Sequence, residues 1–234
     1  MSQDFEKKTN SRVFLFLKRI GDTLVLNLIF VLVSALSAFV LFFPGLVALT
    51  TCLNKMINYE YYNPFLSFFE EIKNQWSFMW RLEVLCMVTL AVLGGIGYLY
   101  YVYIVNYGYT WIIWAAIAIV VSVTIILIIV FLHLLIYNEY FKDDTFFMMI
   151  RKSALIARKK PLISLLMFLF LLCDAIATYI IPYISIFISF SLIVILNLLI
   201  SQNTYKKIYL EEEKRMLLGD NLFLPQVVEE DKKE

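Results

Sequence analysis

Three long stretches of this chain carry almost no charged side chains. Residues 23–54 and 84–138 contain no Lys, Arg, Asp or Glu, and between residues 161 and 205 the only charge is Asp174. A helix in water needs a polar side, whereas about 20 consecutive apolar residues suit the hydrocarbon core of a bilayer. The pattern therefore predicts an all-α, polytopic membrane protein.

Within these stretches we expect the membrane segments 24–43, 46–57, 84–105, 111–137, 162–181 and 183–200. The segment 46–57 follows Pro44 and Gly45, a strong break, and at about 1.5 Å per residue it is short for a full crossing. We therefore expect five to six membrane segments, arranged as a bundle of three helical hairpins, with the second helix short or partly re-entrant.

The basic residues predict the orientation of these segments. Lys and Arg gather before the first segment and in the stretches 58–83, 138–160 and 206–215, whereas the turns at 44–45, at 106–110 and around Pro182 contain none. The positive-inside rule places the charged stretches in the cytoplasm and the neutral turns outside. Both termini are then cytoplasmic, which needs an even number of crossings and favours six. Residues 1–210 form a single transmembrane domain, and 211–234 a charged cytoplasmic tail that is partly disordered.

Two charged segments between the hairpins have the pattern of amphipathic helices, over residues 64–76 and 145–160. Each begins with a helix-start signal, Asn63 and Pro64 in the first and Asp143, Asp144 and Thr145 in the second. Apolar side chains then recur at helical spacing. We expect both helices to lie in the cytoplasmic membrane interface. The candidate partner contacts on them are Phe65, Phe68, Phe69, Phe146, Ile150 and Arg151.

The composition offers little for catalysis. The net charge is +1, which gives no argument for nucleic acid, and Cys52, Cys86 and Cys173 show no metal-ligand spacing. The single histidine, His133, lies within a predicted span. We interpret the acidic pairs at 70–71 and 143–144 and the run 211–213 as solvated helix surfaces. We expect no enzyme activity, no cofactor and no metal site.

Asp174 is the one acidic residue inside a predicted span, and it has two interpretations. A carboxylate at membrane depth is a functional candidate that could bind a proton, a cation or a sugar hydroxyl. It could equally form a hydrogen bond between packed helices. A real ion pathway usually needs polar partners at depth, for which Asn27, Asn197 and His133 are the candidates.

The turn between the third and fourth spans is rich in aromatic residues, from Tyr98 to Trp114. Such residues typically form an aromatic belt at the level of the lipid headgroups. They could also form a stacking surface for sugar rings or another protein. The preceding Gly94, Gly95 and Gly97 favour close helix packing.

Over roughly residues 15–210 the chain resembles the YesL-like family of bacterial integral membrane proteins. The resemblance lies in Gly21 and Asp22 before the first span, the Phe-Pro-Gly break at 43–45, the segment 61–76, the helix end at Lys160 and Pro161, and Pro182. It implies an auxiliary subunit of a carbohydrate importer and supplies no catalytic residues.

We therefore expect a non-catalytic accessory subunit of a carbohydrate (oligosaccharide) ABC importer in the bacterial plasma membrane. Its partners would be the ABC permease subunits and membrane lipids, with the ATPase and the substrate-binding lipoprotein as further candidates. The alternative is a self-sufficient small transporter or channel that uses Asp174.

Overall fold

Helices joined by short turns make up the part of the chain that the computed structural model describes, residues 12–58, 63–108, 110–181, 183 and 188–217. Over these residues no strand is present, which confirms the all-α prediction. The helices with given bounds are α2 (Arg12–Leu36), α3 (Phe42–Ile57), α4 (Pro64–Asn74), α5 (Trp76–Tyr107), α6 (Trp111–Tyr140), α7 (Phe146–Lys159), α8 (Pro161–Ile180) and α10 (Phe190–Leu217).

Four of these helices are long and apolar enough to cross a membrane: Phe16–Leu36 within α2, and the whole of α5, α6 and α8. They indicate a membrane-embedded protein. Helix α3 is apolar but has only 16 residues, which agrees with the prediction that the second segment is short. The predicted span 183–200 is described only in part, and from Phe190 it continues without a break into the charged helix to Leu217.

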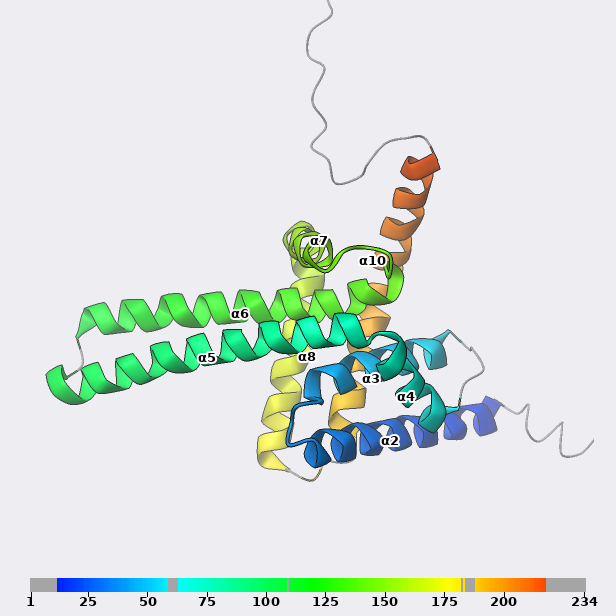
Figure 1. Ribbon diagram of the computed structural model, residues 1–234, viewed down its shortest axis with the longest axis horizontal. Helices are drawn as coiled ribbons and strands as arrows, with labels where there is room; N and C mark the ends of the chain where they lie inside the picture. Colours follow the sequence, from blue (N-terminus) through cyan, green and yellow to red (C-terminus); the bar gives the residue numbers. More distant parts are fainter. Residues whose placement is uncertain (1–11, 59–62, 109, 182, 184–187, 218–234) are drawn as a thin grey trace, which may run out of the picture.

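The short helix α3 is the centre of the fold. It packs against α2, α4, α5, α6 and α10, and Figure 1 shows it between α2 and the start of α5. Val47, Ala48, Leu49, Cys52 and Leu53 are completely buried. The helix is therefore apolar because it is enclosed by other helices, and not only because a bilayer would surround it.

The break between the first two helices lies upstream of its predicted position. Helix α2 ends at Leu36 and α3 begins at Phe42, so Pro44 stands in the first turn of α3, where a missing N–H costs nothing. The turn is made instead by Ala38 and Phe39, with positive φ angles of 50° and 66°, and the Ser37 hydroxyl accepts a hydrogen bond from the Leu41 N–H.

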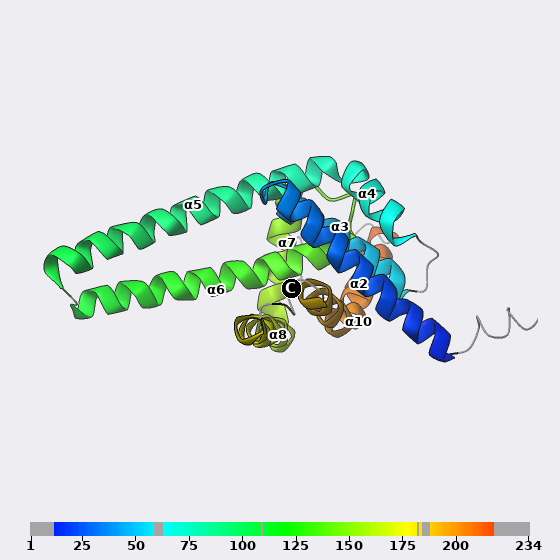
Figure 2. The same cartoon turned by 90° about the horizontal axis from the view of Figure 1, so that it is seen from below.

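Helices α5 and α6 form a hairpin that extends far beyond the other elements (Figure 1). A view turned by 90° shows the same hairpin reaching away from α2, α3 and α4, with α8 and α10 seen nearly end-on (Figure 2). The hairpin and the α8–α10 pair thus run in different directions.

Both predicted amphipathic segments are helices, and each packs one side on the body. The Asn63 side chain caps α4 by accepting hydrogen bonds from the N–H groups of Phe65 and Leu66. Helix α4 contacts α2, α3 and α5, and α7 contacts α6 and α8. The apolar side of each helix is therefore at least partly used inside this chain.

Candidate functional site

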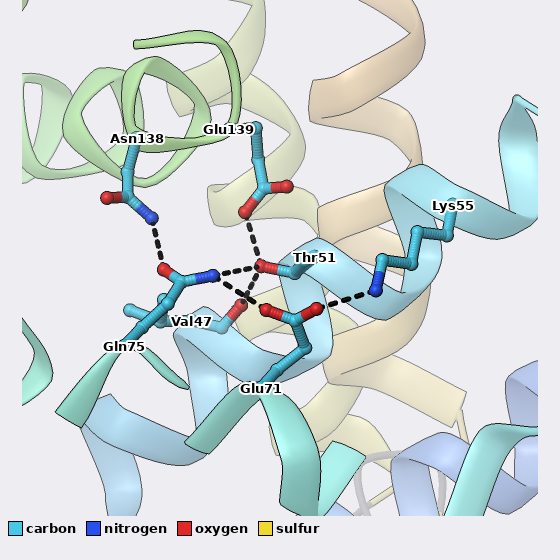
Figure 3. A network of polar contacts seen from close by, with 7 residues as sticks. All are labelled: Val47, Thr51, Lys55, Glu71, Gln75, Asn138 and Glu139. Atoms are coloured by element: carbon cyan, nitrogen blue, oxygen red, sulfur yellow. Dashed lines mark hydrogen bonds and ion pairs between the residues drawn. The ribbon is translucent and has the colours of Figure 1, made fainter. Parts of the chain in front are cut away.

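A polar network joins three helices where the base of the α5–α6 hairpin meets α3 and α4. We define it by six residues that Figure 3 shows in contact: Thr51, Lys55, Glu71, Gln75, Asn138 and Glu139. Thr51 and Lys55 come from α3, Glu71 from α4, and Asn138 and Glu139 from the last turns of α6. Gln75 lies in the link between α4 and α5.

Gln75 is the hub of the polar network because its side-chain amide binds in three directions. Its Nε2 donates to Glu71 Oε2 at 2.9 Å and to Thr51 Oγ1 at 3.3 Å. Its Oε1 accepts from Asn138 Nδ2 at 2.7 Å. One amide thus ties the start of α5 to α3 and to the end of α6.

Thr51 connects the polar network to a second acidic residue, Glu139. Its hydroxyl hydrogen-bonds the Glu139 carboxylate, and it lies 3.2 Å from the Val47 carbonyl oxygen in the preceding turn of α3. Thr51 is buried and Glu139 is half-buried. Satisfied polar groups of this kind fix which sides of packed helices face each other.

Lys55 and Glu71 form an ion pair in which Nζ lies 2.6 Å from Oε1. The Glu71 side chain is only 8% exposed, and that of Lys55 is 31% exposed. Burial raises the pKa of the Glu71 carboxyl, but hydrogen bonds from Lys55 and Gln75 and the charge of Lys142 outweigh burial. Its pKa therefore lies below the usual 4.5, and the carboxylate is charged at neutral pH.

A polar pocket of about 460 Å³ opens beside the network. Its lining includes Glu71, Gln75 and Asn138 of the network, together with the charged residues Arg81, Lys142 and Asp144. Both signs of charge meet there. The pocket can therefore hold water or a small polar group, and it does not select one sign of ligand charge.

Asp144 anchors α7 next to this pocket. Its Oδ2 accepts from the Tyr137 hydroxyl at 2.6 Å and from Lys152 Nζ at 2.9 Å. The interpretation of the acidic pairs as solvated surfaces is therefore wrong for Asp144 and Glu71, because each is held by a lysine from another helix or turn. For Glu70 and Asp143, which are exposed, it is confirmed.

His133 is a buried packing residue in the structure. Its ring nitrogens lie 2.7 Å from the Tyr205 hydroxyl and 2.9 Å from Ser164 Oγ. These bonds connect α6 to α10 and α8. Both nitrogens are occupied, which favours a structural role over proton transfer.

Asp174 lies in a separate place, in the wall of an apolar cavity of about 540 Å³ among α3, α6, α8 and α10. The Ser189 hydroxyl donates to its Oδ1, and Thr178 Oγ1 lies 3.3 Å from Ser189 Oγ. Asn197 lines the same cavity, whereas Asn27 accepts a hydrogen bond from the Ser191 N–H elsewhere.

Asp174 is not alone as an acid in the long apolar helices. Helix α5 begins early enough to include Glu83, which is buried, and α6 extends far enough to include Glu139. Both acids lie where the helices run past the apolar segments 84–105 and 111–137 that the charge pattern marked, so Asp174 stays the one acid inside those predicted spans.

The six candidate partner contacts fall into two groups. Phe65, Phe69 and Arg151 are exposed, and the rings of Phe65 and Phe69 pack edge-on at 5.2 Å. Phe68 is completely buried, Phe146 is 8% exposed, and Ile150 is half-buried. Phe68 and Phe146 cannot meet a partner without opening the fold, whereas the exposed residues can.

Sequence reasoning missed the polar network as a unit. For Glu71 a signal existed, because it follows Phe68 by three residues and so lies on the same side of α4. Gln75, Thr51 and Asn138 carry no comparable signal, since their bonds join segments that are distant in the sequence.

Comparison of this chain with known proteins identifies no relative. No family model, no curated protein and no solved structure matches the chain. Among the described residues, His, Cys, Asp and Glu side chains do not gather in groups of three that could hold a metal ion. What the protein does is therefore argued from its own contacts.

Proposed function

We propose that this protein is a non-catalytic accessory membrane subunit that packs on the permease subunits of a carbohydrate ABC importer. One observation carries the proposal: the α5–α6 hairpin projects from the body and offers a long surface that this chain does not cover. The carbohydrate substrate class rests on the resemblance to the YesL-like family, and the hairpin supports the accessory role.

The hairpin surface is open along most of its length. Among the described residues from 84 to 131, only Ile113 is buried. A side chain added at Gly94, Gly95 or Gly97 would meet nothing within 4 Å. Glycines in membrane helices let a neighbouring helix approach closely, and here no helix of the same chain does so. A partner helix on this surface accounts for both features.

The exposed aromatic pair on α4 offers a second, smaller contact. Phe65 and Phe69 are exposed, whereas Phe68 is buried, and Arg151 of α7 is also exposed. In this proposal these residues meet the membrane interface or the cytoplasmic surface of the permease. Phe68 and Phe146 act from within, by holding α4 and α7 in place.

The proposed setting is the bacterial plasma membrane, with both termini in the cytoplasm and six membrane segments. The distribution of Lys and Arg supports this orientation. The aromatic residues at the tip of the hairpin fit a position at a membrane surface on either side, since Tyr107 and Trp111 are 72% and 79% exposed, as expected at the headgroup level. The second and fourth loops, at 58–83 and 138–160, then face the cytoplasm with their basic residues.

The test is affinity purification of the tagged protein from native membranes in a mild detergent, followed by mass spectrometry. We expect two permeases to be recovered, with an ATPase and a substrate-binding lipoprotein. Gly95→Leu should lose them, because it fills the surface on which a partner helix packs. Gly21→Leu is the matched control, since Gly21 is also helical and has nothing within 4 Å. Recovery of the protein alone would contradict the proposal.

A second candidate is a self-sufficient small transporter or channel, and the cavity beside Asp174 favours it. In that case Asp174→Asn should abolish substrate uptake while the protein still inserts and assembles. Cys173→Ser is the control, because Cys173 is exposed on the same helix. Unchanged uptake by Asp174→Asn would rule this candidate out.

A further inference from the structure

The apolar cavity among α3, α6, α8 and α10 has one ionisable side chain in its wall, Asp174. Its volume of about 540 Å³ falls within the range of roughly 300–1,000 Å³ that is typical of small-molecule sites. The described residues of the lining are mostly aliphatic and aromatic, and they include no Lys, Arg or His. A ligand in this cavity would therefore need a large apolar part, and it would meet a single carboxylate.

The Asp174 carboxylate has a hydrogen bond within the chain but no basic partner among the described residues. The stretches 23–54, 84–138 and 161–205 supply every lining residue and contain no Lys or Arg, and neither ion pair of the described residues involves Asp174. The buried Ser189 hydroxyl donates to Oδ1. One hydroxyl leaves the negative charge uncompensated, and an unpaired charge in apolar surroundings is costly. Acids at membrane depth usually pair with another charged group or serve as the counter-ion of a ligand.

One oxygen of this carboxylate is open to a ligand. Asp174 is half-buried, and its Oδ2 has no hydrogen-bond partner among the described residues, yet it is not one of the oxygens that are sealed off from solvent. The bond from Ser189, which lines the same cavity, holds the carboxylate in the cavity wall. A positive group in the cavity can therefore reach Oδ2 without displacing Ser189.

Four phenylalanines of the lining form a continuous aromatic surface. The ring of Phe42 lies 5.2 Å from that of Phe43 and 5.9 Å from that of Phe190, between centroids. The Phe43 ring lies 5.5 Å from the ring of Phe131. Phe190 directly follows Ser189 in the chain, so the aromatic surface reaches the residue next to the hydroxyl that holds the carboxylate. Aromatic faces attract organic ammonium ions, which favours a cation over a neutral molecule of the same shape.

A bare metal ion does not suit this lining. Hard cations such as Ca²⁺ take about six to eight oxygen ligands, whereas the neighbours of the carboxylate are two hydroxyls, with Thr178 Oγ1 3.3 Å from Ser189 Oγ. Among the described residues, His, Cys, Asp and Glu do not gather in threes that could hold a metal ion. The positive charge must therefore belong to a molecule whose apolar part fills the rest of the cavity.

We propose that this cavity binds an amphipathic organic cation. Its ammonium group lies against the Asp174 carboxylate, and its apolar chain or ring system fills the space lined by the phenylalanines and leucines. The inference is independent of the role in an importer, because it rests on the cavity and not on the α5–α6 hairpin.

Photolabelling of the purified full-length protein in an uncharged detergent tests the proposal. The probe is an alkyl trimethylammonium ion with a diazirine in its chain. It is compared with the neutral analogue, in which a tert-butyl group of the same shape replaces the trimethylammonium group, and with the matching carboxylic acid. We expect the cation to label peptides of α3, α6, α8 and α10 roughly tenfold more than either analogue, because only the cation pairs with the carboxylate. Equal labelling by the cation and the neutral analogue would overturn the proposal.

Asp174→Asn separates the charge from the shape of the site. It keeps the size of the side chain and an oxygen that accepts from Ser189, so labelling by the cation should fall to the level of the neutral analogue. Labelling by the neutral analogue should not change, which shows that the cavity is intact. Asp143→Asn, at an exposed acid outside the lining, is the matched control and should affect neither probe. Cation labelling that Asp174→Asn leaves unchanged would overturn the proposal.

Two changes on α8 locate the site. Ala175→Phe places a ring in the cavity and should abolish labelling by both probes, whereas Cys173→Phe, which lies outside the lining, should leave it unchanged. If Asp174→Asn does not fold, the comparison of the two probes on the unchanged protein decides together with Ala175→Phe. Full labelling by the cation in Ala175→Phe would overturn the proposal.

Discussion

Lys55 of α3 and Glu71 of α4 form an ion pair at 2.6 Å that fixes the enclosed helix α3 to a helix at the edge of the fold. Glu71 also receives a hydrogen bond from Gln75, which in turn reaches Asn138 at the base of the hairpin. The orientation of the hairpin is therefore set by polar contacts at its base, since most of its length touches nothing else in the chain.

Removing the lysine should destabilise the protein. Lys55→Met leaves the Glu71 carboxylate buried without its strongest donor, and we expect a loss of roughly 1–3 kcal/mol in the free energy of unfolding. Thermal unfolding in detergent measures it. Lys73→Met is the control, because Lys73 is an exposed lysine on α4, the helix that carries Glu71. Equal effects of the two changes would show that the ion pair contributes nothing.

The same ion pair predicts an acid-dependent loss of stability. The pKa of Glu71 is lower in the folded protein than the usual 4.5, so its contribution is fully present above that pH. It is lost as the pH falls through the lowered value, because the folded state must then take up a proton. Unfolding temperatures measured from neutral pH down to about pH 3 should show this.

Glu71→Gln should flatten the acid limb of that curve, since an amide does not titrate. Glu70→Gln, at the exposed neighbouring position, should leave the limb as it is in the unchanged protein. An acid limb that is identical in all three proteins would assign the pH dependence to other groups.

Two glycines provide a matched test of packing. A Cβ at Gly45 would lie 3.0 Å from Cδ2 of the buried Phe30 ring, so Gly45→Ala should cost roughly 1–3 kcal/mol through overpacking. A Cβ at Gly94 meets nothing within 4 Å, so Gly94→Ala should be neutral or stabilising through its better helix propensity. Thermal stability of both variants in detergent is the measurement. A Gly94→Ala variant less stable than Gly45→Ala would contradict this packing.

The sequence predicted the helical elements well and their mutual packing poorly. Charge-free stretches and helix-start signals depend on neighbouring residues, so the apolar helices and the capped helix α4 could be recognised. The central position of α3 could not, because enclosure by five other helices depends on contacts between distant segments. The break between α2 and α3 was predicted at Pro44, which was wrong. Proline interrupts a helix only beyond its first turn, and Pro44 lies in the first turn of α3.

The same distinction applies to the candidate site. Consecutive helical residues differ in direction by about 100°, so Glu70 is exposed while Glu71 is buried, although the sequence shows only an acidic pair. The spacing from Phe68 could have indicated this difference. The partner Lys55 could not have been identified, because it comes from another helix.

The orientation in the membrane is a prediction that reporter fusions can check. Alkaline phosphatase is active only outside the cytoplasm, so fused after Gly108 it should be active, and fused after Asp143 it should be inactive. A fluorescent protein that folds in the cytoplasm should give the opposite pattern. Phosphatase activity of the fusion at Asp143 would contradict the six-segment topology. It would mean that the α5–α6 hairpin has the opposite orientation in the membrane.

Photo-crosslinking in living cells tests the accessory-subunit claim most directly. A photoreactive amino acid at position 95, on the open glycine surface of α5, should form a covalent adduct with a permease subunit. The same amino acid at position 21, which is equally open but lies on α2, should not form that adduct. Position 95 yielding no protein adduct, while the protein is inserted and the importer is present, would contradict the account.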